Sequence, residues 1–226
     1  MSEATTQPAL RARWLGRVTY ADPVALQTAL WAGDEQYLLL CEHTPVYKMG
    51  VRTDPANILV DDLAARGADV HRVSRGGDVT WHGPGQVVGY PVVTAPTRRG
   101  GGMADTVAYV RSVEQLLIDA LGDLGLEAGR RAEYPGVWLG DDATGLRKVA
   151  AIGVRLRRGR AMHGFALNVE PDLSWFDAIV PCGIADAGVT SLAAEGCDAS
   201  MHEVVDVMAE RAAALWGSGA VDRADV

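Results

Sequence analysis

Cys182 is the residue of this chain that best fits a nucleophile. It stands between Pro181 and Gly183, outside any regular element, so its thiol could be accessible. Cys41 lies in the apolar run LLLCE and is expected to be a buried small hydrophobic residue. Cys197 has carboxylates beside it in the sequence, and these would disfavour a thiolate. Local sequence alone leaves a structural thiol as the alternative for Cys182.

The second reactive group is an amine. Only Lys48 and Lys148 are lysines, and every other residue of the Lys+Arg class is arginine. Arginine-favouring codon usage explains most of this bias. Lysine, however, can lose its proton in a desolvated site, whereas arginine effectively cannot. Lys148 begins a strand of small and apolar residues, and is either a solvated strand-end lysine or an amine held near a thiol.

The third feature is a glycine-rich segment, residues 75–86, with the sequence RGGDVTWHGPGQ. Four glycines and a proline in twelve residues exclude a helix or a regular strand, so we expect a shaped loop between two strands. Its polar side chains are those of Arg75, Thr80, His82 and Gln86. The segment is neither a P-loop nor a GxGxxG fingerprint. A structural turn with incidental polar residues is the alternative.

Elements of both kinds must position these segments. A helix is predicted over 23–32, with Asp22 as its N-cap and Pro23 at its first helical position. Other helices are predicted over 61–66, 105–124 and 200–216, the last opened by a capping box. Strands are predicted over 36–42, 69–74, 86–93, 137–140, 146–157 and 160–170, of which the last three form consecutive antiparallel strands. Mixed runs of helices and strands predict an α+β fold.

The bulk properties narrow the function classes. A chain of 226 residues fits one domain over 1–226, with 1–10 frayed. The net charge of −8 argues against a nucleic-acid binder. Three cysteines without a CxxC pair argue against disulfides or a Cys-rich zinc site, and no ligand spacing suggests another metal. The chain has no apolar leader and no membrane-length apolar run, so a cytoplasmic protein without membrane contact is expected.

Taken together, the segments resemble the lipoyl(octanoyl) transferase family. The segments that carry the likeness are RGGDVTWHGPGQVVGYPV, RKVAAIGV, MHGFALNV and PCGI followed by ADAGVTSL, in the family's order and approximate spacing. The likeness spans about residues 35–195. Family members share the fold of biotin and lipoate protein ligases, so the resemblance implies a mixed β-sheet flanked by helices.

The resemblance also implies residue roles. Cys182 would be the acyl-thioester nucleophile and Lys148 the group that lowers its pKa and shuttles protons. Asp78 and Trp81 fall where the family varies and receive no individual role, and His163 stays outside the site as a structural histidine. The expected walls of the acyl and carbonyl pocket are Arg75, Gly76, Gly77, Asp78, Val79, Thr80, Trp81, His82, Ala151, Ile152, Gly153, Gly164, Phe165 and Ala166.

The implied reaction moves an octanoyl group from octanoyl-acyl carrier protein to a lysine of a lipoyl domain. Such domains occur in the glycine cleavage H protein and in the E2 subunits of 2-oxoacid dehydrogenases, and the transfer is the first step of endogenous protein lipoylation. No cofactor is needed, and a monomer is expected. Two arginine clusters would steer an acidic carrier protein or form solvated basic tips; they are Arg155, Arg157, Arg158 and Arg160, and Arg98 with Arg99.

Three other functions compete with this interpretation. An ATP-dependent lipoate or biotin protein ligase on the same fold would need no cysteine nucleophile, but the chain shows no convincing phosphate-binding cluster. A non-catalytic module could use the glycine-rich segment only to line an acyl pocket. A papain-like hydrolase would pair Cys182 with His82 or His163, whose surroundings match the acyl-pocket motifs better.

Overall fold

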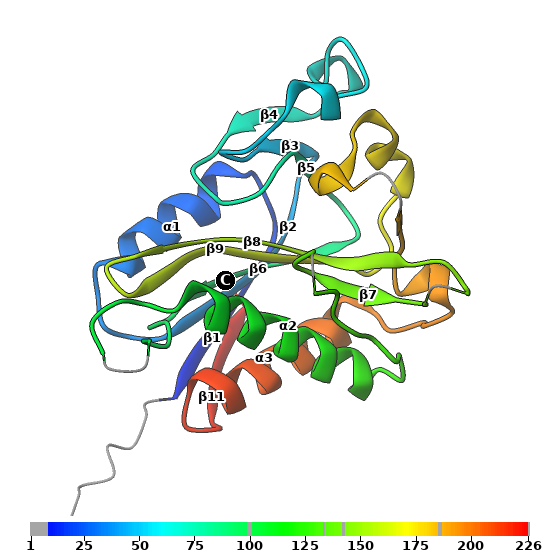
Figure 1. Ribbon diagram of the computed structural model, residues 1–226. Helices are drawn as coiled ribbons and strands as arrows, with labels where there is room; N and C mark the ends of the chain where they lie inside the picture. Colours follow the sequence, from blue (N-terminus) through cyan, green and yellow to red (C-terminus); the bar gives the residue numbers. More distant parts are fainter. Residues whose placement is uncertain (1–8, 99–100, 133, 142, 185–186, 226) are drawn as a thin grey trace, which may run out of the picture.

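A mixed sheet forms the centre of the molecule (Figure 1). The computed structural model describes residues 9–98, 101–132, 134–141, 143–184 and 187–225. Within them the sheet runs in the order β10-β8-β9-β6-β2-β1-β11, with β7 beside β8. Strand β1 is parallel to β2 and β11, and β10 is parallel to β8, whereas the other pairs are antiparallel. The strands are β1 Leu10–Val18, β2 Tyr37–His43, β6 Gln86–Val92, β7 Val137–Leu139, β8 Arg147–Arg157, β9 Arg160–Asn168, β10 Gly188–Val189 and β11 Val221–Asp225.

Helices cover both faces of this sheet (Figure 1). Helices α2 (Thr106–Asp123) and α3 (Met201–Trp216) pack together on one face, and α1 (Ala21–Trp31) packs on the other. A small sheet in the order β4-β3-β5 stands on the α1 side. Its strands are Asp69–Arg72, Val46–Met49 and Thr80–His82. The expected α+β arrangement of a mixed sheet between helices is confirmed.

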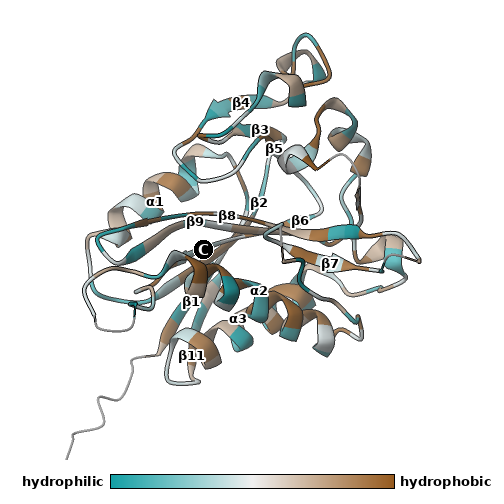
Figure 2. Ribbon diagram, viewed as in Figure 1, coloured by the Kyte–Doolittle hydropathy of each residue, from teal (hydrophilic) through white to brown (hydrophobic). Residues whose placement is uncertain are grey.

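Strand β2 shows how the sequence separates the two sides of the sheet. Successive side chains of a strand point to opposite faces. Leu38 and Leu40 accordingly join the core beneath α2 and α3, while Leu39 and Cys41 join a second cluster with Tyr90. All five are buried, so the expected burial of Cys41 is confirmed. Figure 2 shows hydrophobic and hydrophilic residues alternating along α2 and α3, as expected for helices with one buried face.

The predicted long helices and the 137–170 meander are confirmed, whereas two helix starts are not. Helix α1 begins at Ala21, and the Asp22 carboxylate accepts hydrogen bonds from the amide and hydroxyl of Thr19. Asp22 therefore lies in the first turn instead of capping the helix. Residues 61–66 form only a short 3-10 helix, Ala64–Arg66, which ends at a left-handed Gly67.

Two other expectations need correction. Residues 1–8 lie outside the described residues, but Leu10 is fully buried and pairs with Val221 as the first residue of β1. The glycine-rich segment is not loop throughout, because Thr80–His82 forms β5 and pairs with β3. Tertiary pairing with β3 makes these three residues a strand, despite the glycines on both sides. Strands β1, β3 and β11 were not predicted.

Candidate functional site

Lys148 lies at the second position of β8, between two neighbouring strands. It pairs with Trp138 of β7 on one side and with Val189 of β10 on the other. The side chain is buried, and Nζ lies 4.6 Å from the centroid of the Trp138 ring. Among the described residues, Nζ has no hydrogen-bond partner. Lys148 is thus a buried amine on an aromatic face, and the solvated strand-end alternative is wrong.

The amine of Lys148 shares a cavity with the turn that carries Cys182. Pro181, Cys182 and Gly183 form a short 3-10 helix, but the side chain of Cys182 lies outside the described part of the structure. We call this space the Lys148 cavity. It is lined by Thr80, Trp81, Gln86, Lys148, Ala151, Ala166, Asn168, Phe176, Pro181 and Val189.

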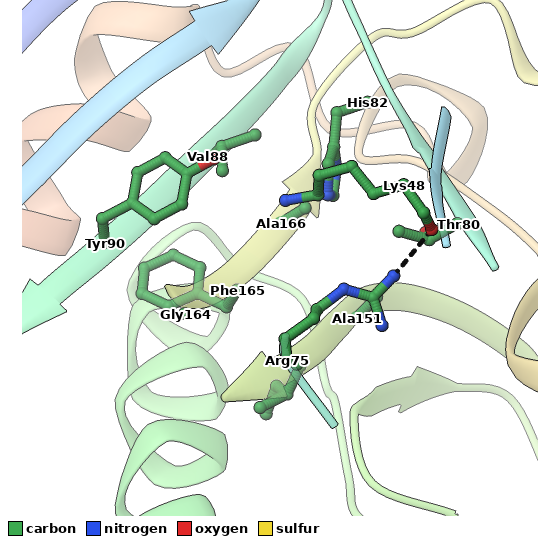
Figure 3. Close-up of a pocket in the computed structure, with 12 residues that line it drawn as sticks. Lys48, Arg75, Thr80, His82, Val88, Tyr90, Ala151, Gly164, Phe165 and Ala166 are labelled. Carbon is green, nitrogen blue, oxygen red and sulfur yellow. Dashed lines mark hydrogen bonds between the residues drawn. The ribbon is translucent and has the colours of Figure 1, made fainter. Parts of the chain in front are cut away.

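A second cavity adjoins it, because Thr80, Ala151 and Ala166 line both (Figure 3). We call it the Lys48 cavity. Side chains from the small sheet and from the segment between β4 and β5 form one wall, and β6, β8 and β9 form the other. It is lined by Lys48, Arg75, Thr80, His82, Val88, Tyr90, Ala151, Ile152, Gly153, Gly164, Phe165 and Ala166.

Arg75 crosses from the glycine-rich segment to the small sheet. Its Nη2 donates to the main-chain carbonyl of Lys48 at 3.0 Å, and its Nη1 donates to the carbonyl of Gly76 at 2.9 Å. A Cβ on Gly153 would lie 2.7 Å from Cδ of Arg75. Glycine at position 153 therefore provides the space in which the Arg75 side chain lies against β8.

Burial sets the charge of the histidines around the Lys48 cavity. It holds the pKa of His82 well below the ordinary value, and the nearby amine of Lys48 lowers it further. Burial also lowers the pKa of His43 to about 4, and the Nε2 atom of His43 lies 2.7 Å from the Tyr90 hydroxyl. Both imidazoles are therefore neutral at pH 7.

A chain of hydrogen bonds runs from His82 to the segment that follows Cys182. His82 Nδ1 lies 2.9 Å from Gln86 Oε1, and Gln86 Nε2 donates to Asn168 Oδ1 at 2.8 Å. Asn168 Nδ2 in turn donates to the carbonyl of Thr190 at 2.8 Å. The amide of Thr190 donates to the carbonyl of Lys148 at 3.0 Å. Both cavities are thus tied to one polar network.

Comparison with known proteins identifies the family. The family model of the lipoyl protein ligase A/B catalytic domain matches residues 19–213. The octanoyltransferase of Mycobacterium sp. (strain KMS) is 48% identical over 217 residues, which cover 92% of this chain and 85% of that relative. The octanoyltransferase of Salinispora tropica is 54% identical over 159 residues, 70% of each chain. This chain belongs to the octanoyltransferase family. It is therefore an acyltransferase.

A solved structure confirms the fold of this family member. The lipoate protein ligase of a bipartite system from Thermoplasma acidophilum superposes with a TM-score of 0.73 at 17% identity. The match covers 98% of this chain and 87% of that one. The predicted biotin and lipoate ligase type of fold is therefore confirmed.

Most of the pocket residues expected from the resemblance to the octanoyltransferase family line one of the two cavities, but four do not. Those four are Gly76, Gly77, Asp78 and Val79. Val79 is buried in a separate apolar cluster. The Asp78 carboxylate accepts hydrogen bonds from the amides of Val79 and Asp54 and from the side chain of Asn57. These contacts give Asp78 a role in fixing the loop instead of lining a cavity.

Several cavity residues of this octanoyltransferase family member were missed. Lys48, Val88 and Tyr90 line the Lys48 cavity, and Asn168, Phe176 and Val189 line the Lys148 cavity. Lys48 had a usable signal, because it is one of two lysines in the chain. Val88, Tyr90 and Val189 lie in strands, Asn168 ends β9, and Phe176 lies in the 3-10 helix Leu173–Ala178. None of these sequence contexts shows which side chain faces a cavity.

The arginines at the β8–β9 turn are partly engaged with their neighbours. Arg155 donates to the Ser74 hydroxyl at 2.7 Å, and Arg157 lies 5.1 Å above the Trp31 ring. Arg158 has a positive φ of 48° at the turn itself.

Among the described residues, no group of three or more His, Cys, Asp and Glu side chains converges as metal ligands do. No helix there is long and apolar enough to cross a bilayer.

Proposed function

We propose that this enzyme transfers an octanoyl group from octanoyl-acyl carrier protein to a lysine of a lipoyl domain, through a thioester on Cys182. The observation that carries the proposal is the Lys148 cavity, which is lined both by the buried Lys148 and by Pro181, the residue next to Cys182. Thirty-three positions of sequence separate Lys148 from Pro181. The names of the family relatives support the octanoyl group as the cargo.

In the first half-reaction, the Cys182 thiolate attacks the carbonyl carbon of the carrier's thioester. The carrier thiolate leaves and takes a proton from Lys148, so one thioester replaces another of similar free energy. Cysteine suits this step because its thiolate is both a strong nucleophile and a good leaving group. Lys148 and Cys182 share their protons as one coupled pair.

In the second half-reaction, the amine of the acceptor lysine attacks the Cys182 thioester. Lys148, now neutral, removes the extra proton from the attacking nitrogen, and the Cys182 thiolate leaves. The product amide lies lower in free energy than the thioester, so no ATP is required.

The adjoining Lys48 cavity is the proposed site of the acyl chain. Small residues keep its floor open on β8 and β9, among them Ala151, Gly153, Gly164 and Ala166. Burial of each methylene contributes about 0.8 kcal/mol, so chain length can be discriminated. The cavities are narrow, about 30 Å³ and 20 Å³, so an entering chain must displace long side chains such as Lys48 and Arg75.

Intact-mass spectrometry tests the covalent step. Wild-type enzyme mixed with octanoyl-acyl carrier protein, without ATP or magnesium, should gain one octanoyl group. The adduct should disappear in Cys182→Ala and persist in the matched control Cys197→Ser. Cys197 suits the control because it is partly exposed and its Sγ lies 3.6 Å from the carbonyl of Leu124, in the α2–α3 region. An adduct that persists in Cys182→Ala would refute the proposal.

The alternative activities give different outcomes in the same assay. A strict requirement for ATP and free octanoate would identify an ATP-dependent lipoate or biotin ligase. Binding of the carrier without any adduct would identify a non-catalytic acyl-binding module.

As part of the proposal, we assign residues 1–226 to one catalytic domain that works as a cytoplasmic monomer, with the H protein and E2 lipoyl domains as acceptors. Sedimentation analysis would test the monomer, and competition between the H protein and E2 lipoyl domains would test the acceptors.

A further inference from the structure

Glu114 is a buried carboxylate of helix α2 that the proposed mechanism does not use. Helix α2 packs against β7 and β8, the strands that carry Trp138 and Lys148 (Figure 1). Glu114 is only 1% exposed, and a buried charge is unfavourable unless hydrogen bonds compensate for it. The other buried residues of α2 are apolar or aromatic: Tyr109, Val113, Leu116, Leu117, Ala120 and Leu121.

Three hydrogen-bond donors surround the Glu114 carboxylate. Arg111 Nη1 donates to Oε2 at 2.8 Å, and Arg130 Nε donates to the same oxygen at 3.1 Å. The main-chain amide of Gly136 donates to Oε1 at 3.3 Å. Arg130 also donates through Nη2 to the carbonyl of Arg111 and to the side chain of Gln115. Glu114 thus fastens to α2 both ends of the segment that leads into β7.

Gly136 is in contact with the side chain of Lys148. A Cβ added to Gly136 would lie 3.3 Å from Cε of Lys148 and 2.7 Å from the carbonyl oxygen of Ala150. The φ of Gly136 is 131°, which also favours glycine. The Lys148 side chain therefore lies against the face of Gly136 on which another residue would carry its Cβ.

The same segment carries the aromatic ring beneath the amine. Trp138 follows Gly136 by two residues, and Nζ of Lys148 lies 4.6 Å from its ring centroid. The main chain of Trp138 exchanges hydrogen bonds of 2.8 and 3.0 Å with Gly129, at the start of the segment. Among the described residues, Nζ has no hydrogen-bond partner. The place of the amine therefore depends on where this segment lies, and Glu114 fixes the segment to α2.

We propose that Glu114 is a positioning residue that sets the place of the Lys148 amine in the site. By binding the amide of Gly136, it holds the segment that carries Trp138 against α2 and thus beneath the Lys148 side chain. Glu114 lines neither cavity, so it acts through Lys148 and not on the substrate. The inference rests on the proposed function, because proton exchange by Lys148 belongs to that proposal.

Glu114→Gln tests the inference, because glutamine keeps the shape of the side chain but has one accepting oxygen. Both arginines and the amide of Gly136 can only donate, so the new NH₂ group must face at least one of them. With its oxygen toward the arginines, glutamine displaces the Gly136 amide. We expect kcat to fall about 10- to 100-fold, the cost of misplacing a catalytic group by about 1 Å. The KM for octanoyl-acyl carrier protein should stay unchanged.

NMR of the lysine side chains reports the position of the amine directly. The chain has two lysines, Lys48 and Lys148, so protein labelled with ¹³C at lysine Cε gives two signals. Lys148→Arg removes one of them and thereby identifies it. The Trp138 ring should shift the Lys148 signal away from that of a free lysine. Most of this shift should be lost in Glu114→Gln, whereas the Lys48 signal should not move.

Asp123→Asn is the matched control. Asp123 is another carboxylate of α2 that pairs with an arginine, but its partner is Arg211 of α3. This change should lower the free energy of unfolding and leave both kcat and the Lys148 signal unaltered. Glu114→Met is the second variant if the glutamine protein does not fold. The side chains of Arg111 and Arg130 are 44% and 32% exposed, so they can turn to water when the carboxylate is lost.

Two results would overturn the inference. One is a Lys148 signal at its wild-type position in a folded Glu114 variant, whatever the kcat. The other is a displaced signal with wild-type kcat. The NMR measurement needs no substrate, so it is independent of the proposed function. If wild-type enzyme forms no adduct at Cys182, the proposed function fails, whereas a Lys148 signal that moves in Glu114→Gln still supports its placement by Glu114.

Discussion

The amine of Lys148 lies 4.6 Å from the centre of the Trp138 ring, on the strand next to its own. An aromatic face attracts a cation without offering a hydrogen-bond acceptor, and such a contact is worth roughly 0.5–2 kcal/mol. It leaves every N–H of the amine available to other groups. The amine is therefore held in position without a hydrogen-bond partner among the described residues, as the proposed proton exchange with Cys182 and substrate requires.

Lys148→Arg should abolish most of the activity while keeping the charge above Trp138. Arginine stays protonated, so it can stabilise a thiolate but cannot remove a proton from the acceptor amine. We expect kcat to fall by roughly 10²- to 10⁴-fold, the usual contribution of a general base. Rapid-quench measurement of octanoyl transfer from preformed acyl-enzyme isolates this step. A variant with wild-type kcat would show that Lys148 acts only through its charge.

Gly153→Ala should weaken binding of the acyl donor. The new Cβ would lie 2.7 Å from Cδ of Arg75 and would displace the guanidinium from the carbonyl of Lys48. We expect KM for octanoyl-acyl carrier protein to rise about tenfold, equivalent to about 1.4 kcal/mol of binding free energy. Steady-state kinetics at saturating acceptor measure this.

Gly122→Ala is the matched control for that experiment. Gly122 lies in α2, and a Cβ there would meet nothing within 4 Å. The change should leave KM unaltered and raise the free energy of unfolding by about 0.5–1 kcal/mol, because alanine favours the helix. A similar KM increase in both variants would argue against a specific contact between Arg75 and residue 153.

Acid should destabilise the fold through His163. Burial, with the charges of Lys48 and Arg75, lowers its pKa to about 4, against about 6.5 when unfolded. Between these values the unfolded chain binds more protons, so the free energy of unfolding falls as pH drops from about 6.5 to about 4. From pH 6.5 to 5 this one group should contribute a loss of about 2 kcal/mol.

His163→Asn should remove that part of the pH dependence. His163 has a φ of 58°, and asparagine is among the few residues that tolerate this left-handed backbone. Urea unfolding at pH 7 and pH 5 gives the comparison. His43, with a pKa of about 4, would keep some acid sensitivity in the variant. An unchanged difference between the two pH values would mean that His163 already binds a proton in the fold.

Charge reversal at the β8–β9 turn tests steering of the acidic carrier. In Arg157→Glu with Arg158→Glu, we expect KM for the carrier to rise, and to rise more at low ionic strength, where screening is weak. The kcat at saturating carrier should stay unchanged because Lys148 is at the other end of β8. Salt-dependent kinetics measure both quantities. Equal KM values in low salt would remove the steering role.

The sequence was most informative where chemistry demands particular residue types. The glycine-rich segment, Lys148 and the Pro-Cys-Gly turn pointed to residues that line the two cavities, since few structural roles require such combinations. Lys48 and Tyr90 could not be placed in it because they reach the cavity only when the small sheet folds over β6, β8 and β9. That arrangement depends on contacts between distant segments.

Predictions from local sequence were wrong where distant or neighbouring groups supplied the hydrogen bonds that the local pattern was expected to supply. Asp22 has the sequence context of an N-cap, but Thr19 donates to its carboxylate and the helix starts at Ala21, two residues before the predicted first helical position. Strand β11 has the sequence VDRAD, which is mostly exposed and lacks an apolar face. Its strand conformation depends on main-chain pairing with β1, for which side-chain periodicity gives no sign.

The parallel pairing of β10 with β8 has a consequence for how this enzyme tolerates motion. Gly188 and Val189 are registered against Arg147 and Lys148 by main-chain bonds, so the segment after Cys182 cannot slide along β8 without breaking them. The amine is thereby anchored to the backbone that leads from Cys182. Widening the cavity at Lys148 would break the main-chain hydrogen bonds between β10 and β8 at the edge of the central sheet. We therefore expect substrates to enter by displacing side chains or the small sheet.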